Sequence, residues 1–202
     1  MRPLLDTFYN FHWVIPGEVA RSSQAYAGFL VRFLKNRGIR AMVNLRGANA
    51  RYAWWHYERR VCSELGVQHL DVMLNSTRLP TRSMLRRLID AFDTAQRPFL
   101  LKCSGGQGRT SLAAALYLIH RFGWETFARA QDQFARFPYR NFPDRGQRWL
   151  KAFLAYAHEQ AKGKPLRAFI EEDYTELGFK AWLESQGLAD AFHGISEAYK
   201  RI

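Results

Sequence analysis

The chain has 202 residues, of which 48% are hydrophobic and 24% are charged. This composition is typical of a globular domain that buries its own core, and it excludes a wholly disordered chain. No stretch approaches the roughly 18 consecutive apolar residues of a membrane-spanning helix. The first ten residues lack a basic start followed by a long apolar run, so we expect no secretion signal. Two cysteines, Cys62 and Cys103, are too few for a disulfide scaffold or a cysteine-rich zinc site, and they favour a reducing, cytoplasmic location.

The charge is strongly positive, with 30 Lys and Arg against 18 Asp and Glu, for a formal net charge of +12. It is also uneven, because residues 171–202 carry seven acidic and three basic side chains. The basic remainder of the chain is expected to attract anionic partners such as phosphorylated substrates. An arginine-rich surface without a specific partner would give the same balance.

In chain order, the hydrophobic pattern predicts helices that alternate with short strands. Residues 1–24 are predicted to be extended, with a turn at Pro16-Gly17. The elements expected after them are a helix (25–37), a strand (39–45), a helix (51–65), a strand (67–74), a helix (79–96), a strand (98–102) and helices at 110–122, 125–136, 145–161 and 166–186.

This order of elements predicts an α/β fold with a central, mostly parallel sheet flanked by helices. Residues 162–165 are the best linker candidate. We therefore expect a catalytic domain over residues 1–161 and a helical C-terminal extension, residues 166–202, that packs on it.

The chemistry is concentrated where the third predicted strand meets the helix at 110–122. The connecting segment reads Cys103-Ser104-Gly105-Gly106-Gln107-Gly108-Arg109. Glycine-rich turns before a helix bind anions, because backbone N–H groups converge there and the helix dipole favours negative charge. A thiol at the start of such a turn is expected to have a lowered pKa and to act as a nucleophile. An arginine at its end offers a planar fork for phosphate oxygens.

The segment resembles the signature of the Cys-dependent protein tyrosine and dual-specificity phosphatases, which reads His-Cys-x-x-Gly-x-x-Arg-Ser/Thr. Cys103, Gly106, Arg109 and Thr110 match this signature. Residues 14–24 and 39–47 also look like the opening segments of small bacterial and atypical dual-specificity members. The likeness extends from about residue 12 to about residue 160 and implies a dual-specificity-phosphatase-like fold.

For function, the resemblance implies hydrolysis of phosphomonoesters without a metal or another cofactor. Cys103 would attack phosphorus and form a phosphocysteine, while Arg109 and the N–H groups of the loop hold the phosphate oxygens. Thr110 would stabilise the thiolate. The substrate-binding residues expected are Ser104, Gly105, Gly106, Gln107, Gly108 and Thr110. The expected partner is a phosphorylated protein or a small phosphorylated molecule, and we expect no nucleic-acid partner and no membrane-spanning segment.

Two positions leave the comparison open. Lys102 precedes the nucleophile where the family has a histidine, and a lysine cannot reproduce the hydrogen bonds of an imidazole. The general acid is also undecided. Asp71 lies 32 residues before Cys103, a spacing that resembles the dual-specificity arrangement, but it falls inside the predicted strand. Asp144 on a later loop is the alternative, and the third choice is that there is no dedicated acid.

Several arginines are predicted to form a phosphate-selecting rim around the loop, although a solvated basic face would look the same in sequence. They are Arg21, Arg46, Arg78, Arg82, Arg86 and Arg87.

Three further functions remain compatible with the sequence. A phosphatase-like module that binds phosphate without turnover would explain Lys102. An RNA 5′-triphosphatase would explain the positive charge. A sulfurtransferase of rhodanese type also uses a cysteine loop, but Arg109-Thr110 leading into a helix favours phosphate.

Overall fold

The structure is a computed structural model that describes residues 4–26 and 28–197. Its centre is a five-stranded sheet with the order β1-β2-β5-β3-β4. The strands are β1 (His12–Ile15), β2 (Val19–Ser22), β3 (Ala41–Asn44), β4 (Gln68–Asp71) and β5 (Phe99–Lys102). Only β1 is antiparallel to its neighbour, so the sheet is mostly parallel, as predicted.

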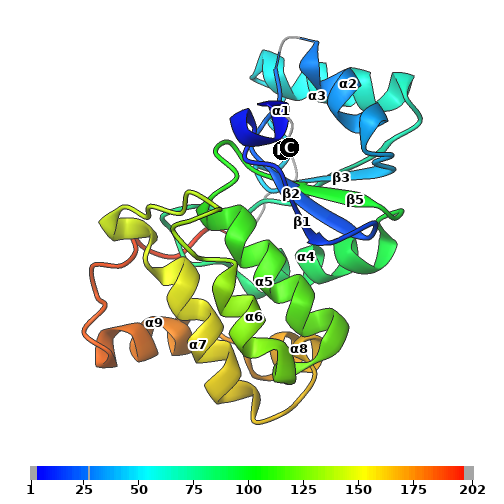
Figure 1. Ribbon diagram of the computed structural model, residues 1–202. Coiled ribbons are helices and arrows are strands. Elements are labelled where there is room, and N and C mark those ends of the chain that lie inside the picture. Colours follow the sequence, from blue (N-terminus) through cyan, green and yellow to red (C-terminus); the bar gives the residue numbers. More distant parts are fainter. Residues whose placement is uncertain (1–3, 27, 198–202) are drawn as a thin grey trace.

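The three central strands are short, and the helices that cover both faces of the sheet bury them completely. Every residue of β2, β3 and β5 is buried. Met42 and Leu100 point to one face and pack with α2 (Phe29–Asn36) and α3 (Ala53–Glu64). Val43 and Leu101 point to the other face, toward α4 (Arg82–Thr94) and α5 (Gly108–Phe122). Figure 1 shows these two helical layers on opposite sides of the sheet.

The N-terminal prediction is corrected by the structure. Residues 1–24 were expected to be extended with a turn at Pro16-Gly17, and β1 and β2 are extended and form a hairpin, but Leu4–Phe8 form the short helix α1. The turn falls at the expected place, where Gly17 adopts a positive φ of 71°. The five-residue helix α1 carries too short a pattern to be distinguished from an extended segment.

The predicted helices at 125–136, 145–161 and 166–186 are each shorter or broken. The structure has a 3-10 turn (Trp124–Thr126), α6 (Phe127–Asp132), a second 3-10 turn (Arg145–Gln147), α7 (Trp149–Ala161), α8 (Leu166–Ala168), a π-helical turn (Phe169–Asp173) and α9 (Glu176–Ser185). The last break falls at Tyr174 and Thr175, whose backbones are extended. There the Tyr174 hydroxyl donates to the Pro80 carbonyl at 2.6 Å, and the Thr175 side chain caps α9.

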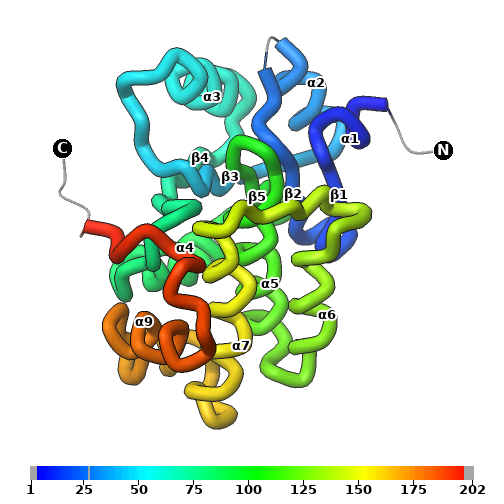
Figure 2. The backbone as a smooth tube through the Cα atoms, turned by 90° about the vertical axis from the view of Figure 1, so that its left-hand side faces the viewer, coloured from blue at the N-terminus to red at the C-terminus, as the bar shows by residue number. Residues whose placement is uncertain are grey.

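The C-terminal extension shares one apolar cluster with α5 and α7, to which Tyr174, Phe179 and Leu183 contribute. Figure 2 shows α9 beside α7, with the C-terminal segment above them. That segment also runs along the loop after β4, where Leu79 N donates to Gly194 O at 2.9 Å and Ser196 N donates to Leu79 O at 2.9 Å. Within the described ranges, no helix has the length and apolar character to cross a membrane.

Truncation of Phe179 to alanine is expected to lower the free energy of unfolding by about 3–5 kcal/mol. The ring is fully buried and packs edge-to-face on Phe153 at 5.2 Å. Urea denaturation of Phe179→Ala would measure the loss. The matched control on the same helix is Leu177→Ala, because Leu177 is 69% exposed and its loss should cost less than about 0.5 kcal/mol. Equal effects of the two changes would show that the extension lies outside the cooperative core.

Candidate active site

The candidate nucleophile lies at the carboxyl end of the central strand of the sheet. β5 runs between β2 and β3 and ends at Lys102, and Cys103 follows it directly. The chain then turns through residues 104–107 and enters the 15-residue helix α5 at Gly108. The helix N-terminus therefore adjoins the turn, which is the arrangement that favours a bound anion. Ten consecutive buried residues, 110–119, fix α5 against the sheet.

The structure brings four predicted site residues, Arg109, Thr110, Gln107 and Gly106, to the Cys103 thiol. Cys103 is only 3% exposed, and burial alone would raise its pKa. The Arg109 charge, a hydrogen bond from the Thr110 hydroxyl and the backbone N–H groups of Gln107 and Gly106 outweigh burial, so the pKa of Cys103 is lowered. The Thr110 hydroxyl is buried, and no other polar group in the described part of the chain engages it, so it is free to donate to the thiolate. A lowered pKa gives Cys103 the thiolate that a nucleophile needs.

The second cysteine has the opposite environment. Cys62 is fully buried on α3, and burial together with the nearby Glu58 carboxylate raises its pKa to about 12. Cys62 therefore stays a thiol near neutral pH and acts as an apolar core residue.

Arg109 is half-buried and reaches across the loop. Its Nη2 donates to the Ser104 hydroxyl at 3.2 Å, and its Nη1 donates to the Leu74 carbonyl at 3.4 Å. Leu74 follows β4, so the guanidinium joins the glycine-rich loop to the neighbouring loop of the sheet. Its planar fork is thereby held beside the thiol.

Gly106 occupies the position in the loop where only glycine fits. Its φ is +64°, and an added Cβ would lie 2.5 Å from the Ser23 nitrogen and 2.6 Å from the Ser22 carbonyl carbon. Its carbonyl accepts hydrogen bonds from Asn10 Nδ2 at 3.0 Å and Arg21 Nη2 at 3.1 Å. The loop is thus pressed against the end of β2 and the segment before β1.

Arg21 does not lie on the predicted rim. Its side chain is fully buried under the loop, and its Nη1 donates to the Gln133 carbonyl at 2.9 Å. Asn10 is also buried, at 3% exposure, and contacts the same loop. Sequence reasoning missed Asn10 entirely, because nothing in its neighbourhood distinguishes it from a turn residue.

The other predicted rim arginines mostly serve the fold. Arg82 donates to the Tyr174 carbonyl at 2.6 Å, and Arg86 lies 3.9 Å from the Glu171 carboxylate, so both face the C-terminal extension. Arg78 donates to the Ile195 carbonyl at 3.4 Å. Arg46 bonds to Gln24 and stacks over the Trp54 ring at 3.7 Å.

Lys102 forms a fully buried ion pair on the α3 face of the sheet. Its ammonium donates to a Glu58 carboxylate oxygen at 2.5 Å, and both side chains are 1% exposed. His69 lies 3.9 Å from the same Glu58 oxygen and 3.7 Å from Asp71. The lysine that replaces the family histidine therefore has its charge balanced by a carboxylate of the next layer.

The structure places Asp71 on the same face as Lys102. Asn44 pairs with Lys102 of β5 on one side and with Asp71 of β4 on the other, so two strand spacings, about 10 Å, separate those two backbones. The Asp71 carboxylate accepts hydrogen bonds from Asn44 Nδ2 at 2.7 Å and from the Trp55 indole of α3 at 3.0 Å. Cys103 instead packs in the cluster of α4 and α5. The role of Asp71 as general acid stays a prediction.

Asp144 occupies an exposed position before a 3-10 turn, where its carboxylate accepts a 3.4 Å hydrogen bond from Gln147. No carboxylate occurs in the loop between Asn75 and Arg78. Among the described residues, no group of three or more His, Cys, Asp or Glu side chains is placed to hold a metal ion.

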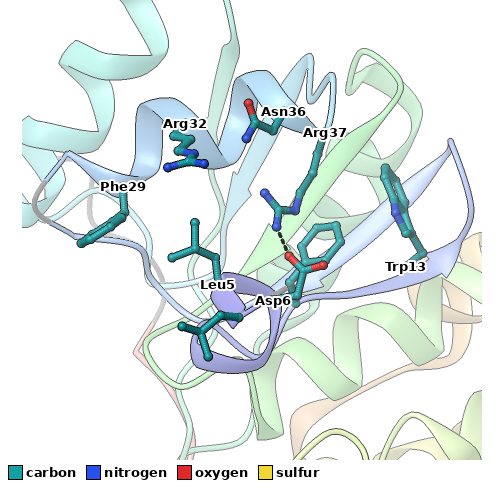
Figure 3. A pocket seen from close by; sticks show the side chains of 9 residues that line it. Leu5, Asp6, Trp13, Phe29, Arg32, Asn36 and Arg37 are labelled. Atoms are coloured by element: carbon teal, nitrogen blue, oxygen red, sulfur yellow. Dashed lines mark ion pairs between the residues drawn. The ribbon is translucent and has the colours of Figure 1, made fainter. Parts of the chain in front are cut away.

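A hollow of about 230 Å³ adjoins the start of α5. Gly108 forms part of its wall, and Arg136, Arg148 and Lys151 line it. Arg148 is paired with Asp190 at 2.5 Å, while Arg136 stacks over the Phe142 ring at 5.2 Å. A larger hollow of about 450 Å³ lies between α1 and α2, where Arg37 pairs with Asp6 (Figure 3). Its lining residues include none from the glycine-rich loop.

One protein-family profile matches residues 9–152, most of the chain. Its description is PTP-SAK, the "Swiss Army Knife protein, DSP-PTPase phosphatase domain". The chain belongs to this family. The resemblance to the Cys-dependent dual-specificity phosphatases, which the sequence suggested, is thereby confirmed. No curated protein matches the sequence significantly.

Solved structures show the same fold as this PTP-SAK domain at low sequence identity. TpbA of P. aeruginosa is 21% identical, with a TM-score of 0.60 over 82% of this chain and 92% of TpbA. The catalytic core of the PP-IP phosphatase SIW14 of S. cerevisiae, in complex with citrate, is 16% identical, with a TM-score of 0.52 over 89% and 93% of the two chains. PTPMT1 in complex with PI(5)P is 15% identical, with a TM-score of 0.54 over 72% and 95%.

Substitution of Gly106 by alanine is expected to weaken anion binding by the loop. The added Cβ would collide with backbone atoms of Ser22 and Ser23, which cannot move without moving β2. Gly105→Ala is the matched control, because its Cβ would meet only the Gln107 side chain at ordinary contact distances of 3.6 Å and above. Calorimetric titration with orthovanadate should give at least a roughly tenfold weaker affinity for Gly106→Ala. Similar affinities for both variants would contradict the tight packing of the loop.

Removal of one member of the buried ion pair is expected to cost about 3–5 kcal/mol of folding stability, because the other charge is left without a partner. Lys102→Met tests this, since methionine fills the space without the charge. The double variant Lys102→Met, Glu58→Met should recover most of the loss, because it removes both charges. The midpoints of denaturant unfolding give the stabilities of the wild type, Lys102→Met and the double variant. A double variant as unstable as Lys102→Met would mean that the pair contributes packing rather than charge balance.

Proposed function

We propose that the chain hydrolyses phosphomonoesters, with Cys103 as the nucleophile and a phosphocysteine as the intermediate. The observation that carries the proposal is the lowered pKa of this thiol, which lies beside Arg109 in a loop closed by a helix N-terminus. Membership of the PTP-SAK family supports it.

The residues then have defined roles in two displacements. In the first, the Cys103 thiolate attacks phosphorus, an S–P bond forms and the bond to the leaving oxygen breaks. The Arg109 guanidinium and the loop N–H groups of residues 104–109 hold the three remaining oxygens. In the second, water attacks phosphorus, the S–P bond breaks and inorganic phosphate leaves. The Thr110 hydroxyl donates to the sulfur and stabilises the departing thiolate.

The leaving oxygen needs a proton unless it leaves readily as an anion. We keep Asp71 as the proposed general acid, with Asp144 as the alternative. Asp71 would have to leave its hydrogen bonds with Asn44 and Trp55 to reach the site. A chain without a dedicated acid would favour aryl phosphates or phosphoanhydrides, whose leaving groups are weakly basic.

The substrate is proposed to be a phosphorylated protein or a small phosphorylated molecule. Among proteins of the same fold, a serine variant of TpbA binds phosphotyrosine, SIW14 is a PP-IP phosphatase and PTPMT1 binds PI(5)P. The cations Arg136, Arg148 and Lys151 beside Gly108 support an anionic substrate.

A phosphate-binding module without turnover is the second candidate. It is favoured by one observation, the replacement of the family histidine by Lys102, which is paired with Glu58. Such a module would hold oxyanions at the loop but would release no product.

Hydrolysis of p-nitrophenyl phosphate against pH, in EDTA, separates the two candidates. The wild type should turn over, and its rate should fall about tenfold per pH unit below the Cys103 pKa, because the thiol becomes protonated. Cys103→Ser should be inactive yet still bind vanadate. An inactive wild type that binds vanadate would favour the binding module, and a fully active Cys103→Ser would refute the cysteine mechanism.

The same assay assigns the acid when the leaving group is varied. If Asp71 protonates the leaving oxygen, Asp71→Asn should slow an alkyl phosphate far more than p-nitrophenyl phosphate. Asp144→Asn is the matched comparison. A uniform loss on both substrates would mark Asp71 as a structural residue.

A further inference from the structure

Arg21 is a buried cation without a carboxylate partner in the described part of the chain. Its side chain is fully buried, yet every ion pair found there joins other residues. Its partners are neutral: the Gln133 carbonyl at 2.9 Å, the Gln133 side-chain oxygen at 3.2 Å, the Ser111 hydroxyl at 2.8 Å and the Gly106 carbonyl at 3.1 Å. The guanidinium also lies over the Tyr139 ring at 4.2 Å. An unpaired buried charge is costly, so a fold that keeps one needs a reason.

A second arginine that packs on aromatic rings, Arg37, has its charge balanced in the usual way, by a carboxylate. Arg37 also stacks on aromatic rings, Phe11 at 4.6 Å and Phe33 at 4.1 Å. It has a carboxylate partner, Asp6, as the dashed line in Figure 3 shows. Arg21, unlike Arg37, therefore needs a negative charge that is not a carboxylate bonded to it. The Cys103 thiolate is such a charge, and it acts on Arg21.

The connection runs through a single peptide unit. The carbonyl of the Gly106–Gln107 peptide accepts two hydrogen bonds, from Asn10 Nδ2 and from Arg21 Nη2. The N–H of that peptide belongs to Gln107 and donates to the Cys103 sulfur. Donors at the oxygen of a peptide polarise it and strengthen the hydrogen bond at its nitrogen. They also fix its orientation beside Gly106, whose positive φ few other residues adopt.

We propose that Arg21, assisted by Asn10, is a positioning residue that orients and polarises the Gly106–Gln107 peptide so that its N–H stabilises the Cys103 thiolate. The buried charge of Arg21 is balanced by the anion on the other side of the loop, first the thiolate and then the bound phosphate. The proposal rests on the proposed function only in taking Cys103 as the reactive thiol.

Other charged groups also act on the thiol. Arg109 on α5 and Lys102 on β5 carry charges that act on the thiol, and Glu58 balances Lys102. The Tyr139 phenol, which packs on Arg21, acts on the guanidinium. The test therefore has to change Arg21 while these groups stay in place. It also has to measure the pKa of the Cys103 thiol without relying on turnover.

The measurement is the pH dependence of iodoacetamide alkylation at Cys103, followed by peptide mass spectrometry so that Cys62 is read separately. Arg21→Met, which keeps the bulk of the side chain, should raise the Cys103 pKa by about one unit or more. Arg21→Lys keeps the charge but loses the two-pronged contact, and it should fall between the wild type and Arg21→Met. Arg37→Met is the matched control, because it removes a stacked arginine remote from the loop and should leave the Cys103 pKa unchanged.

Asn10→Gly keeps the test decisive if Arg21→Met fails to fold. Asn10 has a positive φ of 50°, which glycine adopts without strain, so this change deletes the amide without disturbing the backbone. The hydrogen bonds lost are those to the Gly106 carbonyl, to the Tyr139 carbonyl at 2.9 Å and to His12 at 3.1 Å. It should also raise the Cys103 pKa. A folded Arg21→Met, or Asn10→Gly in its place, with a wild-type thiol pKa would overturn the proposal. If the variants have a raised Cys103 pKa but the wild type itself cleaves no phosphoester, the positioning role of Arg21 is supported and the proposed function is refuted.

Discussion

The contact between the Gly106 loop and the end of β2 is the constraint on which the candidate site depends. At Gly106 the two backbones approach so closely that a single added carbon would lie 2.5 Å from the Ser23 nitrogen. The backbone of Gln24 adds a hydrogen bond to the Ser104 carbonyl at 3.1 Å. Because β2 also pairs with β5 in parallel, the strand that delivers Cys103 and the strand that shapes its loop are neighbours in one rigid sheet. The N-terminal hairpin is therefore part of the site although it contributes none of the signature residues.

The polar side chains at this edge of the sheet are divided between its two faces. Lys102, Asn44 and Asp71 form one row across three strands, and α3 covers them with Glu58 and Trp55. Cys103, one residue further along β5, turns to the α4 and α5 face. This alternation follows from the two-residue period of a strand. It explains why Lys102, the residue before the nucleophile, pairs with Glu58 of α3 on the face opposite Cys103.

The sequence was sufficient to predict the features that depend on local pattern. The apolar runs in β3 and β5, the glycines of the loop and the spacing of Cys103 and Arg109 specified the α/β fold and the family. The parts that were missed depend on distant contacts. Arg21 looks like a surface residue in sequence, since its burial is decided by Gln133 and Tyr139, more than a hundred positions away. The break at Tyr174 likewise depends on the Pro80 carbonyl.

The pairing of Leu79 with Gly194 and Ser196 ties the loop after β4 to almost the last described part of the chain. The same loop provides the Leu74 carbonyl that holds Arg109. During synthesis, the sheet and the glycine-rich loop leave the ribosome well before residues 193–196 do. The edge of the site opposite α5 then lacks its backbone partners until residues 193–196 have emerged. The site is thus completed only by the pairing of Leu79 with Gly194 and Ser196, which is one of the longest-range contacts in the fold.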